Sequence, residues 1–138
     1  MFRFRKTLDI VTVFHKASSP ASVRVANLAK QISAGAQVTA TQDPDVKHKV
    51  NRDPFELNIT EDAPTADQVQ TIIEYLGKGG AGKVVQGAKD DKDALKKFRE
   101  NKDSFLRPVT VDWNSGKAVV GDNESEILKL LAEQQEQQ

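Results

Sequence analysis

The stretch "RPVTVDWNSGKAVVG", residues 107–121, decides the fold. Val109, Val111 and Trp113 alternate with other residues, which predicts a strand with one apolar face. The turn signal "NSG" follows, and "KAVV" resumes the strand pattern at once. Because a parallel crossover needs about a dozen residues or more, a connection this short joins antiparallel strands. The sequence therefore predicts a β-hairpin here rather than another parallel strand.

A strand and a helix are predicted near the start of the chain. Residues 8–14, "LDIVTVF", are apolar and β-branched, which is typical of a buried strand in a parallel sheet. Ser19 predicts the N-cap of the following helix, Pro20 its first residue and Gly35 its end. The apolar stripe of this helix consists of Ala21, Val25, Leu28, Ala29 and Ile32.

The middle of the chain predicts a second strand and two more helices. Residues 55–60, "FELNIT", alternate in polarity, as a half-buried strand does. Thr65 and Gln68 form the pattern of a capping box, and Gly77 predicts the end of the helix that they begin. A shorter helix is expected over residues 91–101.

A last helix follows the hairpin, and Asn123 with Glu126 predicts its capped start. The complete element order is then βαβα-α-ββα. This order predicts an α/β protein with a central four-stranded mixed sheet flanked by helices, which is the thioredoxin-like arrangement. The side chains of this helix that face the core are predicted to be Ile127, Leu128, Leu130 and Leu131.

The length of 138 residues suits one domain, which we expect over residues 8–133 with a surface loop at about 36–53. Residues 134–138 have no apolar anchor and are expected to fray. The segment 1–7, "MFRFRKT", is basic and contains no acid. It is either a short lead into the first strand or part of a mitochondrial transit signal.

Charge and composition exclude several classes of function. Twenty basic residues balance twenty acidic ones, so the basic footprint of a nucleic-acid-binding protein is absent. No apolar run approaches the roughly 20 residues of a membrane span. Without cysteine the chain has no disulfide, no thiolate zinc site and no nucleophilic sulfur. His15 and His48 are far apart in sequence, so no metal site is predicted.

The run "GKGGAGKV", residues 77–84, contains the G-x-x-x-x-G-K core of a phosphate-binding loop. That motif needs Ser or Thr after the lysine and lies between a strand and a helix. Here Val84 follows Lys83, and the run leaves a helix. We therefore expect a flexible connector and no nucleotide site.

The serine-rich turn in "FHKASSPASVR", residues 14–24, has two interpretations. The unpaired amides and positive dipole end of a helix N-terminus favour an anion or a bound thiolate, to which Ser19 can donate a hydrogen bond. Alternatively, Ser19 only caps the helix. The residue types at this position are compatible with both.

The same turn resembles the start of arsenate-reductase-like proteins of the thioredoxin superfamily, which carry a pattern similar to H-N-P-x-C-S-x-S. His15 matches the histidine, Ser19 falls on the cysteine and Ser22 on the second serine, whereas Lys16, Ala17 and Pro20 depart from the pattern. The segment "FLRPVTVDWNSGKAVVGDNESEILKLL", residues 105–131, resembles the closing part of the same superfamily. This resemblance implies a cis bond before Pro108.

Nearly the whole chain resembles a family of small fungal mitochondrial redox proteins with a thioredoxin-like fold. The segments that carry this resemblance are "FHKASSPAS", "FELNITEDAPTADQ" and "VDWNSGKAVVGDNE". It implies a mitochondrial location and a nominal oxidoreductase class. Serine stands where a reactive cysteine is expected, so the resemblance leaves the question of enzyme activity open.

Three functions are consistent with these features. The favoured one is a redox-family protein, a monomer, that binds a thiol-bearing or anionic small molecule, or a mitochondrial protein, between Ser19 and Pro108. No cofactor is required, and glutathione is a candidate ligand. The alternatives are a transferase-like enzyme in which Ser19 steadies the thiolate of glutathione, and a non-catalytic interaction domain. The candidate binding residues are Ser18, Ser19, Ser22, Arg24, Arg107 and Pro108, and Ser19 is the candidate catalytic residue.

Overall fold

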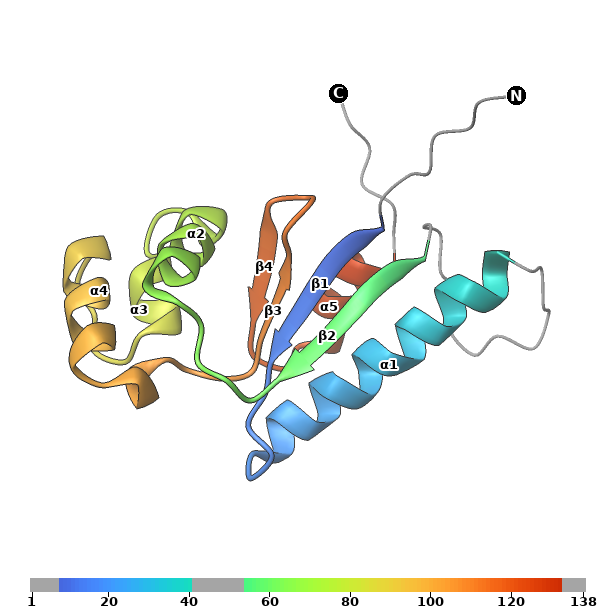
Figure 1. The fold of residues 1–138 in the computed structure, drawn as a ribbon, viewed down its shortest axis with the longest axis horizontal. Coiled ribbons are helices and arrows are strands. Elements are labelled where there is room, and N and C mark those ends of the chain that lie inside the picture. Colours follow the sequence, from blue (N-terminus) through green and yellow to red (C-terminus); the bar gives the residue numbers. More distant parts are fainter. Residues whose placement is uncertain (1–7, 41–53, 133–138) are drawn as a thin grey trace.

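The computed structural model describes residues 8–40 and 54–132 (Figure 1). It confirms the predicted α/β class and the predicted elements in their order, and it adds one short helix between the second and third predicted helices. The basic lead 1–7, loop residues 41–53 and the tail from residue 133 lie outside the described residues. The elements are β1 (Asp9–Phe14), α1 (Pro20–Ala40), β2 (Phe55–Thr60), α2 (Ala66–Leu76), α3 (Gly80–Val84), α4 (Asp91–Glu100), the 3-10 turn η1 (Lys102–Ser104), β3 (Val109–Asp112), β4 (Lys117–Val120) and α5 (Glu124–Leu131).

The four described strands form one mixed sheet in the order β2-β1-β3-β4. Strands β1 and β2 are parallel, with Val13 opposite Ile59. Strand β3 is antiparallel to β1, with Thr110 opposite Val13, and it forms the predicted hairpin with β4. The sheet therefore joins a parallel βαβ unit to a C-terminal hairpin through the pairing of β1 with β3.

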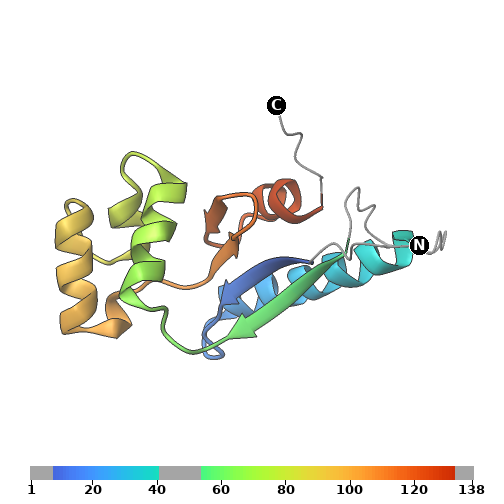
Figure 2. The same ribbon diagram turned by 45° about the horizontal axis from the view of Figure 1, so that its top comes forward.

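Alternation along the strands separates two buried clusters on the two faces of the sheet. Val11 and Val13 point to the face covered by α1 and α5, whereas Phe14, Val109 and Val111 point to the face where α2, α3 and α4 gather. Figure 2 shows α2, α3 and α4 grouped beside the hairpin, away from α1. The first cluster also contains Val25, Ala29, Ile32, Ala36, Phe55, Ile127, Leu130, Leu131 and Ala132.

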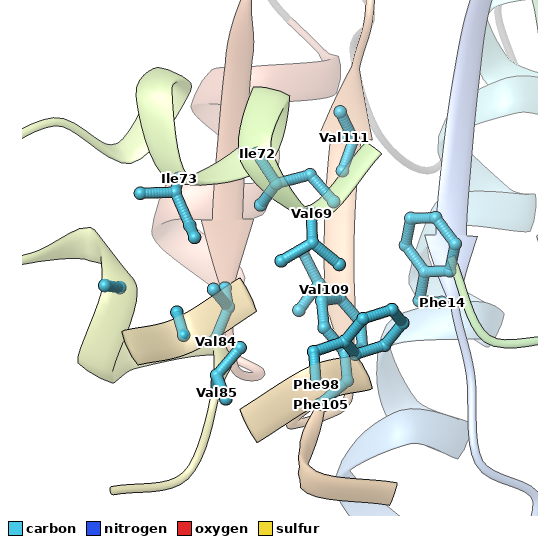
Figure 3. Close-up of a cluster of buried hydrophobic side chains, with 12 residues drawn as sticks. Phe14, Val69, Ile72, Ile73, Val84, Val85, Phe98, Phe105, Val109 and Val111 are labelled. Atoms are coloured by element: carbon cyan, nitrogen blue, oxygen red, sulfur yellow. The ribbon is translucent and has the colours of Figure 1, made fainter. Parts of the chain in front are cut away.

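Aromatic rings organise the second cluster (Figure 3). The ring centroid of Phe105 lies 5.5 Å from that of Phe14 and 6.2 Å from that of Phe98, both in edge-to-face geometry. Phe105 also forms an isolated antiparallel bridge with Val85. The segment that leads into β3 is thus held by both the sheet and the helices α3 and α4.

The predicted caps of α2 and α5 are confirmed. Thr65 Oγ1 accepts the amide of Gln68 and the side chain of Gln68 accepts the amide of Thr65, which completes the capping box of α2. Gly77, at φ 78°, ends that helix. Asn123 Oδ1 accepts the amide of Glu126 at the start of α5. Within residues 8–40 and 54–132, no helix is both long and apolar enough to cross a membrane.

The prediction that Gly35 ends the first helix is wrong, because α1 continues to Ala40. Residues 36–40 of the expected loop are therefore helical. Gly35 is itself buried, and the next residue, Ala36, is fully buried in the first cluster. A glycine within a helix costs about 1 kcal/mol relative to alanine, and the burial of Ala36 in the core offsets part of this cost.

The glycine run, residues 77–84, is packed against the core and is not the flexible connector that the sequence predicted. It forms the short helix α3 between α2 and the bridge of Val85, and Gly80 and Ala81 are buried. A Cβ atom on Gly80 would lie 2.7 Å from Cβ of Leu76 and 3.1 Å from the carbonyl oxygen of Ile73. The glycine at this position therefore permits close packing of α3 on α2.

The Gly80→Ala variant should lower the free energy of unfolding by about 1–3 kcal/mol, because the added methyl group overpacks the contact with Leu76. Urea denaturation followed by circular dichroism measures the change. Lys83→Ala changes an exposed side chain of the same short helix and is the control. Equal stability of Gly80→Ala and Lys83→Ala would contradict the packing role of Gly80.

Candidate functional site

The end of β1 and the start of β3 meet at one end of the sheet, where α1 also begins (Figure 1). Phe14 pairs with Val109, and the register carried one residue further sets His15 alongside Pro108. The amide of His15 donates to the carbonyl oxygen of Thr60 at 2.8 Å, which holds the end of β1 to β2. The peptide bond between Arg107 and Pro108 is cis, as the superfamily resemblance implied. We call residues 14–24 together with 107–110 the junction.

A tight turn leads from β1 into α1. The amide of Ser19 donates to the carbonyl oxygen of Lys16 at 2.9 Å, and the amide of Ala17 donates to Oε1 of Glu61 at 2.9 Å. Ser19 Oγ accepts the amide of Ser22 at 3.3 Å, so Ser19 is the cap of α1. The hydroxyl proton of Ser19 is not used by this bond and is left to donate to another group.

Four buried polar atoms of the junction have no hydrogen-bond partner among the described residues. They are Ser22 Oγ, Thr110 Oγ1, His15 Nδ1 and Arg107 Nε. Ser22 and Thr110 are each 0% exposed. A buried polar group without a partner costs about 1–3 kcal/mol, so the fold keeps this region at a cost in stability.

The first turns of α1 and Pro108 are connected through the segment after β4. The amide of Gly121 donates to the carbonyl oxygen of Pro108 at 3.0 Å. The next residue, Asp122, accepts from Nη2 and Nε of Arg24 at 2.5 and 3.0 Å. A strand ladder and an ion pair therefore connect α1, β3 and the chain after β4 at this end of the sheet.

The carboxylate of Asp122 holds Arg24, one of the candidate anion contacts. The hydrogen bond from Arg24 lowers the pKa of Asp122 below its ordinary value. The side chain of Arg24 is 66% exposed, so water screens this pair strongly. Arg24 thus contributes to the junction as a connection between α1 and the segment after β4.

The other predicted site residues divide into two groups. Ser18, Ser19 and Ser22 lie together in the turn and first helical turn of α1, and Ser18 is exposed. Arg107 and Pro108 lie at the start of β3, and Pro108 is buried. The continued register sets Pro108 alongside His15, at the start of the turn that leads to the serines.

Sequence reasoning did not select Thr110 and Asp122, and it assigned His15 a role only through the resemblance. Thr110 is a polar residue in a strand whose neighbours Val109 and Val111 face the other cluster, and this alternation was visible in the sequence. The partner of Asp122 is Arg24, which is distant in sequence, so only the tertiary structure reveals the pair. Within the described residues, no group of three or more His, Asp or Glu side chains could hold a metal ion.

A family model described as "Protein of unknown function (DUF1687)" matches residues 2–122. The chain belongs to this family. Over 63 residues it is also 36% identical to a protein of Schizosaccharomyces pombe named "Putative redox protein fmp46, mitochondrial". The aligned part covers 46% of this chain and 52% of that protein, so the chain spans about half the length of the curated relative it matches.

Loss of the Ser19 cap should destabilise the protein measurably. We expect Ser19→Ala to lower the free energy of unfolding by about 1 kcal/mol, because the amide of Ser22 loses its acceptor. Thermal and urea denaturation measure the change, and Ser18→Ala, one residue away and exposed, is the control. Two variants of equal stability would be inconsistent with a capping role.

The depressed pKa of Asp122 predicts the sign of a pH effect. Its carboxylate contributes stability above the pKa of the unfolded chain, and this contribution is lost as the pH falls through the lower, folded value. Asp122→Asn should therefore be less stable than wild type at neutral pH, and the difference should shrink as the pH falls from about 5 toward 2. Urea denaturation across this range tests it, with Asp62→Asn as an exposed control. A difference in the free energy of unfolding between wild type and Asp122→Asn that grows as the pH falls would contradict a stabilising role of the Asp122 carboxylate.

Proposed function

We propose that this chain is a mitochondrial member of a redox-protein group with a thioredoxin-like fold, and that it binds a thiol-bearing or anionic ligand at the junction. Glutathione is the candidate ligand, and the chain supplies no thiol catalysis of its own. The strand order β2-β1-β3-β4, with one parallel pair and a C-terminal hairpin, supports the thioredoxin-like assignment. The words "redox" and "mitochondrial" in the relative's name support the class and the location.

The observation that carries this proposal is the group of buried, unpartnered polar atoms at the junction. Ser22 Oγ and Thr110 Oγ1 are fully buried hydroxyl groups, and Arg107 Nε adds a cationic donor. Such groups are costly unless a ligand or ordered water pairs with them. Ligand binding would recover part of the free energy that the unliganded fold gives up.

The helix terminus adds a second favourable term for an anion or a thiolate. Pro20 has no amide proton, and the amide of Ser22 is occupied by Ser19, so the amide of Ala21 is the free donor of the first turn among the described residues. Together with the dipole of α1, this amide favours negative charge. We assign Ser18, Ser19 and Ser22 to hydrogen bonding, Arg107 to charge and Pro108 to the facing wall.

Serine in place of cysteine limits the chemistry. A serine hydroxyl forms neither a disulfide nor a mixed disulfide, and the chain contains no cysteine. Ser19 can only donate a hydrogen bond to a bound sulfur. Val23 within the junction and Leu106 just before Arg107 are 39% and 36% exposed and offer apolar contact to the uncharged part of a ligand.

Nuclear magnetic resonance titration of the full chain with glutathione tests the proposal. We expect amide shifts at Ser19, Ser22 and Val109, and the Ser22→Ala variant should bind about two- to tenfold more weakly because one hydrogen bond is lost. The same substitution removes a hydroxyl that has no hydrogen-bond partner among the described residues, so the free energy of unfolding should be unchanged or raised.

S-methylglutathione separates recognition of the thiol from recognition of charge, because it keeps every charge and lacks the thiol proton. Weaker binding of the methylated compound indicates contact with the sulfur, and equal binding indicates an anion site. Unmoved amides at Ser19, Ser22 and Val109 with both compounds would refute binding at the junction.

The Ser19→Cys variant reports on the electrostatics of the same position. A thiol at the N-terminus of α1 should titrate with a pKa below the usual value of about 8.5. Thiolate absorbance against pH measures it. An ordinary or raised pKa would indicate that Ser19 is only a helix cap.

A further inference from the structure

Strand β4 has one unpaired edge. It is the last strand in the order β2-β1-β3-β4. The amide of Gly121 donates to Pro108, so the alternation of an antiparallel ladder directs the backbone groups of Val119 and Lys117 toward β3. The amides and carbonyl groups of Ala118 and Val120 then point away from the sheet. No hydrogen bond from a described residue reaches them.

A groove of about 810 Å³ lies along this edge. One wall is formed by Tyr75 and Leu76 of α2 with Lys83 of α3, and the other by Lys129 and Leu130 of α5. Figure 2 shows α2 and α5 on opposite sides of β4. Strand β4 forms the floor, so a segment bound in the groove lies next to the outward backbone groups of Ala118 and Val120.

The walls carry a charge preference. The lining contains three lysines, Lys83, Lys117 and Lys129, and one acid, Glu126. The lining also contains apolar side chains, including those of Leu76 and Val120. Each wall holds a lysine and a leucine, Lys83 with Leu76 and Lys129 with Leu130, so an extended segment that carries both acidic and apolar side chains matches the groove.

We propose that β4 and this groove bind an extended acidic segment of a partner protein by strand addition, with the segment as a fifth strand. The backbone of Ala118 and Val120 supplies the pairing, and the exposed Lys83 favours acidic side chains. A second copy of this chain fits less well, because antiparallel pairing of two β4 strands would bring two lysine-rich grooves together. This surface lies on the hairpin edge and is independent of ligand binding at the junction.

Fluorescence anisotropy of the full chain with a labelled peptide of alternating glutamate and valine tests the proposal. We expect saturable binding. Methylation of alternate backbone nitrogens in the same peptide keeps its charge and removes donors, so it should raise the dissociation constant at least about fivefold. A peptide of alternating lysine and valine should not bind.

Matched variants locate the site. Ala118→Pro removes an outward amide while keeping the ladder to β3, and it should weaken binding of the glutamate–valine peptide about fivefold. Lys83→Glu should weaken it about threefold or more, whereas Lys92→Glu, an exposed lysine of α4, should not. Circular dichroism checks that each variant is folded. If Ala118→Pro does not fold, the affinity of Lys83→Glu for the glutamate–valine peptide and the affinity of the wild type for the methylated peptide test the proposal.

Three outcomes would overturn the proposal. Equal binding of the methylated peptide would mean charge attraction without strand addition. An equal loss of affinity for the glutamate–valine peptide in Lys83→Glu and Lys92→Glu would mean that the peptide does not bind in the groove. A dimer in sedimentation that Ala118→Pro abolishes would assign the edge to a second copy of this chain.

Discussion

The pairing of β1 with β3 is the interaction on which the rest of the structure depends. Strand β1 belongs to the parallel unit and β3 to the hairpin, so this antiparallel ladder joins the two halves into one sheet. Alternation along the same two strands separates the clusters, since Val13 faces α1 and α5 while Phe14 and Val109 face the other helices. The ladder also brings the end of β1 to Pro108, which creates the junction.

The junction retains buried polar groups at a cost in stability. Apolar residues at Ser22 and Thr110 would remove two unsatisfied buried hydroxyls, and burial of a methyl group in their place is usually favourable. A ligand that forms hydrogen bonds with these two hydroxyls would explain why both positions are polar. Departures from well-satisfied packing of this kind are typical of functional or strained sites.

The two proposed surfaces use different chemistry because they occupy different parts of one sheet. The junction lies at the strand ends, where a long helix begins and hydroxyl groups gather. The groove lies along a strand edge, where the unpaired groups are backbone and the nearby charges are lysines. Gly121 connects them, since it follows β4 and donates to Pro108.

Local patterns in the sequence determined the elements, their order and most caps, because capping boxes, turn residues and apolar periodicity act over a few neighbouring residues. "NSG" alone excluded a parallel crossover, and Ser19 with Pro20 located the start of α1. Tertiary contacts decided the rest. Gly35 did not stop α1 because Ala36 is buried in the core, and the glycine run became α3 because Gly80 packs on α2. The Arg24–Asp122 pair and the unpartnered Thr110 depend on residues far apart in sequence, which only folding brings together.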